Sequence, residues 1–228
     1  MSLFKNCYKQ NFELYDSLMA YHDYQKKILP SIKEIVSVKD KFIADIGCGT
    51  GILTSLFVDD AKKVCLCDSS TKMLEGAKKR LSNISSSKFE IQLANSFNLP
   101  YSNNTFDIII EGWSLSFCIK DISLWDKLVE ELLRTLKKDG VLIIIETLGY
   151  GVETPNCTNS HLNAFYSYLV NGKGFDFKWI RTDYKYENEN QAILYSNAFF
   201  DYEIVEELLT NPKSIIPECT GFWWFTKM

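Results

Sequence analysis

Along the chain, apolar segments of strand length alternate with segments whose apolar residues have helical spacing, and this alternation predicts the fold class. Segments of strand length rich in apolar residues recur in the first two-thirds of the chain, and the one at 106–110 is nearly continuous, which is typical of a strand buried on both faces. They lie at 42–46, 64–67, 89–93, 106–110 and 141–145. Between them, apolar residues at three-and-four spacing predict helices over 52–59, 70–81 and 122–136, the last ended by the Asp139-Gly140 pair. Strands and helices in this alternation form βαβ units around a parallel sheet, so we expect an α/β protein.

The two ends of the chain have a different pattern from this central part. Residues 1–40 carry apolar and aromatic positions at helical spacing, with Pro30 as a break, which predicts two or three N-terminal helices. Residues 149–178 contain one helical patch, and a strand, a helix and a strand are expected after it. These last elements lie at 179–186, 202–209 and 220–226. No repeat or linker divides the chain, so we expect a single domain over 1–228, with the last two strands added to the same sheet.

The amino-acid composition indicates a globular protein and argues against some partners, but it does not indicate which reaction the protein catalyses. With 46% hydrophobic and 24% charged residues, the chain has the balance of a soluble globular protein. A formal net charge of -4 argues against a nucleic-acid partner, since such proteins normally present a basic face. The seven cysteines include no C-x-x-C pair, which favours a reducing cytoplasm and no metal site. No signal peptide opens the chain, and no apolar run reaches the roughly 20 residues of a membrane helix, so we expect a cytoplasmic protein without a membrane partner.

A glycine-rich segment stands where the first predicted strand ends and a helix begins. It reads DIGCGTG over residues 45–51, and its glycines allow a tight turn and close approach of a ligand. Free N–H groups at the helix start favour a carboxylate or a phosphate. The spacing G-x-G-x-G differs from the dinucleotide fingerprint, and Asp45 would repel a pyrophosphate. A ligand with both an ammonium and a carboxylate suits the loop better, and the methionine part of S-adenosylmethionine (SAM) has both.

A second acidic residue, Asp68, follows the next predicted strand. A carboxylate at that strand end can accept hydrogen bonds from both hydroxyls of a ribose, as it does in dinucleotide sites. Each acid alone could equally be a helix N-cap or a turn residue. Asp45 and Asp68 together, at two neighbouring strand ends, favour a nucleoside derivative as the ligand.

Residues 42–147 resemble the core of the class I SAM-dependent methyltransferases, in particular the small-molecule enzymes of the ubiquinone/menaquinone type. The matching segments are ADIGCGTG at 44–51, DSSTKML at 68–74, NLPY at 98–101 with FD at 106–107, and LRTLKKDG at 133–140. The resemblance implies SAM as the cofactor. It also implies a Rossmann-like, seven-stranded, mostly parallel sheet with helices on both faces and the last strand antiparallel.

The resemblance also assigns roles to single residues. Asp45 and Gly47 would hold the methionine part of SAM, Asp68 the ribose, and Met73 would pack near the adenine. Residues 95–97 fall where the family has its adenine-reading turn, although Asn95 stands in place of the usual aspartate and Ser69 in place of an apolar residue. The complete expected cofactor-binding set is Asp45, Gly47, Cys48, Gly49, Gly51, Asp68, Ser69, Met73, Asn95, Ser96, Phe97 and Glu111.

Candidates for the reaction itself lie at the end of the fourth predicted strand and in the flanking segments. Glu111 follows that strand directly, in a place that faces the transferable methyl group in the resembling family; a general base and a plain strand-end carboxylate are equally good interpretations. The two histidines, His22 and His161, are further catalytic candidates, although a lone histidine is more often solvated or part of a core. Tyr15, Tyr21 and Trp113 are expected to contact substrate, with core packing as the alternative.

The domain is therefore expected to contain four parts. These are an N-terminal helical lid at 1–40, the SAM-binding core at 41–148, a substrate-side insertion at 149–178 and C-terminal strands with a helix at 179–228. We expect methyl transfer to a small molecule by in-line displacement at the sulfonium methyl group. The acceptor atom, O, N, S or C, stays open, as do the use of a base, the pathway and the choice between monomer and homodimer. Alternatives are a SAM-binding protein without catalysis or with a protein substrate, and a nicotinamide-dependent oxidoreductase, which ranks low.

Overall fold

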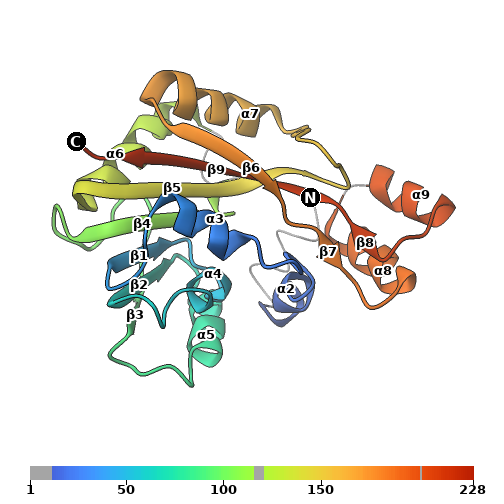
Figure 1. Ribbon diagram of the computed structural model, residues 1–228, viewed down its shortest axis with the longest axis horizontal. Coiled ribbons are helices and arrows are strands. Elements are labelled where there is room, and N and C mark those ends of the chain that lie inside the picture. The colour runs from blue at the N-terminus through green and yellow to red at the C-terminus, as the bar shows by residue number, and fades with distance from the viewer. Residues whose placement is uncertain (1–11, 116–120, 201) are drawn as a thin grey trace.

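A seven-stranded sheet runs through the centre of the molecule, with helices on both of its faces (Figure 1). The structure is a computed structural model and describes residues 12–115, 121–200 and 202–228. Across the sheet the strands follow the order β3-β2-β1-β4-β5-β9-β6. Their bounds are Phe42–Ile46 for β1, Lys63–Asp68 for β2, Phe89–Leu93 for β3, Phe106–Gly112 for β4, Leu136–Tyr150 for β5, Asp176–Arg181 for β6 and Glu218–Thr226 for β9.

Strands β1 to β5 pair in parallel, whereas β9 is antiparallel to both of its neighbours, β5 and β6. The predicted fold, a mostly parallel seven-stranded sheet with an antiparallel last strand, is thereby confirmed. The parallel register places Ile46 beside both Cys67 and Glu111. The carboxyl ends of β1, β2 and β4 therefore meet at one edge of the sheet, where ligands bind in open α/β sheets.

Each face of the sheet is covered by its own layer of helices because successive strand residues point to opposite sides. Ile109 and Ile144 pack in one apolar core, and Ile108 and Ile143 pack in the other. The first layer holds α6 (Trp125–Thr135), preceded by the short helix Ile122–Leu124, and α7 (Ser160–Ser167), extended by Tyr168–Gly172. The second layer holds α3 (Ile28–Ile35), α4 (Ile52–Ser55) and α5 (Thr71–Arg80).

Residues 182–217, inserted between β6 and β9, form a small unit that is called the cap below. It contains β7 (Tyr184–Lys185), α8 (Glu189–Phe199), α9 (Tyr202–Thr210) and β8 (Ile215–Ile216). The N-terminal helix α2 (Phe12–Met19) joins it through Leu18, which is buried in the same apolar cluster as Tyr184 and Phe199. Figure 1 shows α2 and the cap at the same end of the sheet. Cap and α2 thus lie where they can cover a ligand at the carboxyl edge.

Two predicted helix boundaries are wrong. The helix expected to reach residue 136 ends at Thr135, and β5 begins directly after it. The register between β4 and β5 shifts there and Asp139 takes φ 59°, so the Asp139-Gly140 pair forms an irregularity within β5 rather than a helix end. The helix expected over 52–59 stops at Ser55, and turns follow it.

The cap was only partly predicted. The strand expected at 179–186 is split, because β6 ends at Arg181 and β7 pairs with β8 in a separate two-stranded sheet. Helix α8 was not predicted at all. Its apolar residues form no single stripe, since Leu194 is 64% exposed while Ala192 and Phe199 are buried.

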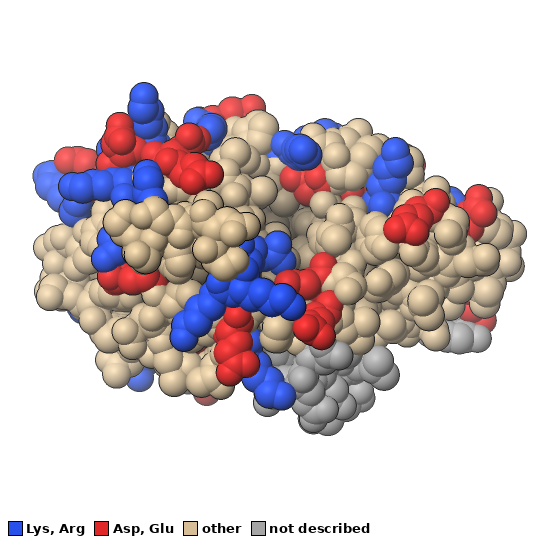
Figure 2. All heavy atoms as spheres, turned by 90° about the horizontal axis from the view of Figure 1, so that it is seen from below, with Lys and Arg blue, Asp and Glu red and all other residues tan. Residues whose placement is uncertain are grey.

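Charges of both signs are interspersed on the face of the molecule seen in Figure 2, with wide uncharged areas between them. Several of these charges are paired, as in the exposed ion pair of Lys33 with Asp60 at 2.8 Å. In the described ranges, no helix combines the length and the apolarity that crossing a membrane requires.

Candidate functional site

The glycine loop after β1 has a backbone that its glycines make possible. Gly47, Gly49 and Gly51 have φ values of 70°, 53° and 73°, in the left-handed region that side chains disfavour. A Cβ atom on Gly47 would also lie 2.1 Å from Oγ of Ser114, far inside van der Waals contact. The loop therefore brings bare backbone to the edge of the sheet, where a ligand can approach it closely.

Two buried carboxyls flank this loop at the ends of neighbouring strands. Asp45 is 1% exposed and accepts a hydrogen bond from the hydroxyl of Thr54. Burial raises the pKa of Asp45 to about 7, and the charge of Asp68 adds to this effect. Asp68 is 4% exposed and accepts the N–H groups of Gly49 at 2.9 Å and Ser70 at 2.8 Å. Together the two acids make a negative environment that favours a cationic ligand beside the loop.

Helix α2 is docked directly onto the glycine loop. Asp16 accepts a hydrogen bond from the hydroxyl of Thr50 and forms an ion pair with Arg80 at 2.9 Å. Arg80 also donates from Nε to the carbonyl of Thr50 at 2.9 Å. A Cβ atom on Gly76 would lie 2.9 Å from the ring of Phe12, so α2 packs closely on α5. These contacts hold α2 in place against the glycine loop.

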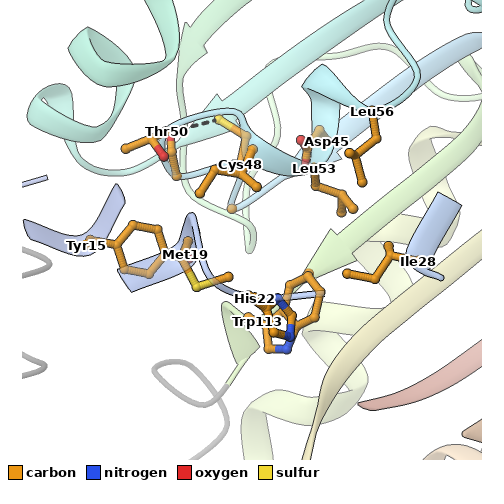
Figure 3. Close-up of a pocket in the computed structure, with 14 residues that line it drawn as sticks. Tyr15, Met19, His22, Ile28, Asp45, Cys48, Thr50, Leu53, Leu56 and Trp113 are labelled. Carbon is orange, nitrogen blue, oxygen red and sulfur yellow. Dashed lines mark hydrogen bonds between the residues drawn. The ribbon is translucent and has the colours of Figure 1, made fainter. Parts of the chain in front are cut away.

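A first cavity, of about 40 Å³, lies between α2 and the glycine loop (Figure 3). Asp45, Cys48 and Thr50 line it on the side of the loop, and Leu53 and Leu56 continue that side along α4 and the turn after it. Figure 3 shows Tyr15, Met19 and His22 opposite them, with Trp113 and Ile28 closing one end. Backbone, a carboxyl and apolar side chains thus converge on one small space.

The residues expected near an adenine ring lie beside α5 and after β3. Met73 is fully buried, whereas Ser69 is exposed. Asn95 is exposed, and its Oδ1 accepts the N–H of Phe97 at 2.9 Å, within a tight turn that also includes Ser96. None of these five residues lines the first cavity, so their contact with a ligand stays a prediction.

Glu111, at the end of β4, is fully buried beside a second acid. Its Oε1 accepts a hydrogen bond from the hydroxyl of Ser114, and its Oε2 has no hydrogen-bond partner in the described part of the chain. Burial raises the pKa of Glu111 well above its usual range, and the charge of Glu146 raises it further. Glu146, 1% exposed on β5, accepts the N–H of Leu115 at 2.9 Å. This shift favours the neutral form of Glu111, which can donate a hydrogen bond, over the carboxylate.

A second cavity, of about 100 Å³, adjoins the first. Four residues, Tyr15, Met19, His22 and Trp113, line both of them. The other lining residues are Leu18 on α2, Thr147 on β5, Tyr184 and Phe200 in the cap, and Glu218 on β9. The two spaces are therefore neighbours, separated by side chains that belong to the lining of both.

His22 stands in that wall as a neutral side chain. Its ring lies 5.4 Å from the ring of Trp113, edge-on, and 4.8 Å from the ring of Tyr184. Burial lowers the pKa of His22 to about 3, and its Nε2 is buried without a hydrogen-bond partner among the described residues. Trp113 has φ 52°, a strained value for a bulky residue, and its N–H is held by the carbonyl of Ile145 at 2.8 Å.

Glu218 is a buried acid in the wall of the second cavity that sequence reasoning missed. It is 4% exposed, and its Oε2 has no hydrogen-bond partner among the residues that are described. Burial raises the pKa of Glu218 to about 8, against the effect of the neighbouring hydroxyls of Thr147 and Tyr184. The signal available in the sequence was an acid directly before the apolar run of β9, but nothing local linked it to Trp113 or His22.

Two residues expected at the site lie elsewhere. His161 is exposed at the start of α7 and lines neither cavity, because its helix packs on the sheet face and not at its edge. Tyr21 packs between Tyr186 and Tyr195, with ring centroids at 5.0 and 5.4 Å, and also lines neither cavity. The geometry thus gives no support to a catalytic His161 or to a substrate contact from Tyr21.

The segment 149–178 also lies away from both cavities as far as the chain is described. Phe165 stacks edge-on against Trp125 at 5.2 Å, and Tyr166 stacks on Trp223 at 4.2 Å. Both side chains are buried in the core between α7 and the sheet. The structure thus supports a role for these two aromatic side chains in core packing rather than in lining either cavity.

Comparison with known proteins finds similarity to methyltransferases in the central part of the chain. Residues 44–144 match the family model described as "Methyltransferase domain". The ubiquinone/menaquinone biosynthesis C-methyltransferase UbiE of Campylobacter jejuni (serotype O:2) is 31% identical over 130 residues, 54% of this chain and 52% of that protein. The demethylmenaquinone methyltransferase of Lactobacillus johnsonii is 34% identical over 136 residues, 58% of this chain and 52% of that protein. The chain thus spans about half the length of these curated relatives.

Solved structures agree on the fold. The YcgJ protein of Bacillus subtilis aligns with a TM-score of 0.62 at 16% identity, covering 90% of this chain and 100% of that one. Phosphoethanolamine N-methyltransferase 2 of Haemonchus contortus, in complex with SAM, aligns with a TM-score of 0.62 at 16% identity, covering 100% of this chain and 60% of that one. Residues 44–144 thus match a methyltransferase domain, and the strand order of the sheet agrees with the fold of these solved structures.

Proposed function

We propose that this protein transfers the methyl group of SAM to a small-molecule acceptor. The observation that carries the proposal is the pair of adjoining cavities, which share Tyr15, Met19, His22 and Trp113 as a common wall. One cavity lies over the glycine loop and the other beneath the cap. The methionine end of a cofactor in the first cavity and an acceptor in the second would lie next to each other at these shared residues, which favours the proximity that group transfer needs.

The described residues fit SAM on three counts. The left-handed backbone at Gly47 and Gly49 lets the methionine part lie against bare main chain. Asp45, at the cavity wall, is placed to accept from the ammonium group, and Asp68, at the end of β2, from the ribose hydroxyls. When bound, SAM supplies a methyl group that its sulfonium makes electrophilic. The negative environment of these two acids favours a ligand that carries two positive charges.

The rest of the chain would position the acceptor and keep water out. His22 and Trp113 form the wall at which the methyl group would be exposed, and a neutral imidazole there adds no repulsion toward a sulfonium. Glu111 is buried at the end of β4 and lines neither cavity, so a contact between its side chain and the cofactor stays a prediction. We assign the cover over the acceptor to α2 and the cap, 182–217, in place of the segment 149–178. In this proposal α2 takes the role of the lid predicted at 1–40, of which residues 1–11 lie outside the described part of the chain.

Ligand titration and an acceptor assay test the proposal. We expect calorimetry to detect SAM and S-adenosylhomocysteine binding and to detect no NADH binding, because Asp45 and the G-x-G-x-G spacing disfavour a pyrophosphate. We further expect release of S-adenosylhomocysteine when small-molecule acceptors are added. Binding of NADH in preference to SAM would contradict the proposal in favour of an oxidoreductase. SAM binding with transfer to proteins alone would favour a protein substrate.

SAM binding should depend on pH through Asp45. This carboxyl has a pKa of about 7 in the empty site, and only its ionised form attracts the ammonium group. Raising the pH from 5.5 to 7.5 should therefore tighten binding, and binding near pH 6.5 should release a proton. Calorimetry in buffers of different ionisation enthalpy measures that release, in a range where the amino group of the ligand stays protonated. Asp45→Asn should abolish the proton release; an unchanged release would assign it to another group.

A further inference from the structure

The second cavity is acidic and carries no positive side chain among its described lining residues. Glu218 is its one carboxyl, and His22, its one imidazole, is neutral at physiological pH. An acceptor with a carboxylate or a phosphate would find no counter-charge there. The cavity therefore selects for a neutral or cationic acceptor.

The charged groups packed around Glu218 do not change this conclusion. Asp183, on the cap, adds a negative charge next to Glu218, and it accepts the N–H of Glu218 at 3.1 Å. That charge is already paired with Arg181, whose Nε lies 2.7 Å from Oδ1 and whose second nitrogen lies 2.9 Å from Oδ2. On β5 the facing groups are the hydroxyls of Thr147 and Tyr150, and on the cap that of Tyr184. Among the described residues, no ion pair therefore joins Glu218 to a cationic side chain.

The remaining walls of the cavity are largely aromatic. Tyr15, Trp113, Tyr184 and Phe200 line it from four separate elements. Ring faces attract cations, and the attraction grows when the cation is removed from water. A buried carboxylate surrounded by aromatic rings favours an ammonium ion as ligand, because the rings and the carboxylate both attract positive charge.

We propose that the acceptor is a small organic amine, held as its ammonium ion by Glu218 between the aromatic walls of the second cavity. This inference rests on the proposed function and names its substrate class. A cavity of about 100 Å³ has room for several water-sized groups, which suits an amine of about one ring. Glu218 would be the residue that distinguishes an amine from an uncharged molecule of the same shape.

The transfer balances without a further reactant. The bound ammonium gives one proton to the carboxylate of Glu218, and the freed lone pair on nitrogen forms the new bond to the methyl carbon. The carbon–sulfur bond breaks, its electron pair stays on sulfur, and the product is a methylated ammonium ion beside neutral S-adenosylhomocysteine. Because the pKa of Glu218 is about 8 in the empty cavity, the group is largely protonated at pH 7; binding of the ammonium ion releases that proton to solvent and leaves the carboxylate that takes the proton of the ammonium. The proton on Glu218 then leaves to solvent as the site opens.

The test uses the protein saturated with S-adenosylhomocysteine and three probes of one shape, benzylamine, benzyl alcohol and benzoate. Calorimetry at pH 7 should show benzylamine binding most tightly, by about tenfold or more over benzyl alcohol, and benzoate most weakly. Glu218→Gln should reduce the preference for the amine to about threefold or less, because the neutral amide cannot balance the ammonium charge. Glu189→Gln, the same change on the exposed surface of the cap, should leave it intact.

The outcomes separate the two proposals. Failure of the wild type to bind S-adenosylhomocysteine overturns the proposed function, and this inference with it. Binding of S-adenosylhomocysteine with no detectable benzylamine binding, or with benzyl alcohol or benzoate bound more tightly, overturns only the inference. An unchanged preference in Glu218→Gln also overturns it. If Glu218→Gln no longer binds S-adenosylhomocysteine, the inference is tested on the wild type only, by whether benzylamine binds more tightly than benzyl alcohol and benzoate.

Discussion

Replacing Asp68 by alanine is expected to weaken SAM binding by about 10- to 100-fold, the usual effect of losing hydrogen bonds to a charged group. The carboxylate is buried at the end of β2, and it also holds the N–H groups of Gly49 and Ser70. Its removal takes away the acceptor for the ribose and loosens the loop at the same time. Calorimetric titration with SAM measures the loss.

The matched control for this change is Asp59→Ala. Asp59 is exposed in the turn after α4, and its side chain lies away from the glycine loop. We expect its removal to leave SAM affinity within about twofold, as surface changes normally do. Equal affinities for the Asp68 and Asp59 variants would remove the ribose contact from the proposed site. Asp68→Asn should lie between them, because the amide oxygen can still accept from one backbone N–H.

Replacing Gly47 by alanine is expected to abolish measurable SAM binding. The new methyl group would occupy the space of Oγ of Ser114, 2.1 Å away, at a backbone φ of 70°. Ser114 is hydrogen-bonded to Glu111, so its displacement would also disturb the buried acid next to it. Titration with SAM, together with the melting temperature, measures both consequences.

Gly174→Ala is the control that separates the effect of backbone strain from the effect of the steric clash with Ser114. Gly174 has φ 74°, almost the same as Gly47, but a Cβ atom there would meet nothing within 4 Å. Left-handed backbone costs a residue with a side chain roughly 1–2 kcal/mol, so both variants should lose a few degrees in melting temperature. Only Gly47→Ala should lose SAM affinity. Normal affinity in Gly47→Ala would show that Ser114 moves freely and that the loop tolerates a side chain.

The sheet and the cofactor side of the site could be predicted from sequence because their signals are local. A glycine loop between a strand and a helix, with Asp45 before it and Asp68 after the next strand, lies within a short stretch of chain. Parallel pairing then brings the ends of these strands together without further information. Apolar strand runs, covered on both faces, indicated the same architecture.

The acceptor side could not be predicted in this way, because its walls come from distant parts of the chain. Leu18, Thr147, Tyr184 and Glu218 meet only after α2 and the cap have packed together. Glu111 shows a second limit: its position was evident, but its protonation depends on Glu146, on another strand. His161 shows a third limit, since a histidine in a segment without clear periodicity carries no signal of which surface it will face.

The docking of α2 has one more consequence. Tyr15, Met19 and His22 belong to this single helix and the turn after it, yet they close both chambers, and Asp16 ties them to Thr50 and Arg80. If α2 moved away from Thr50 and Arg80, both cavities would lose part of their lining at the same time. We therefore expect ligand entry into the two cavities to be coupled through this one helix.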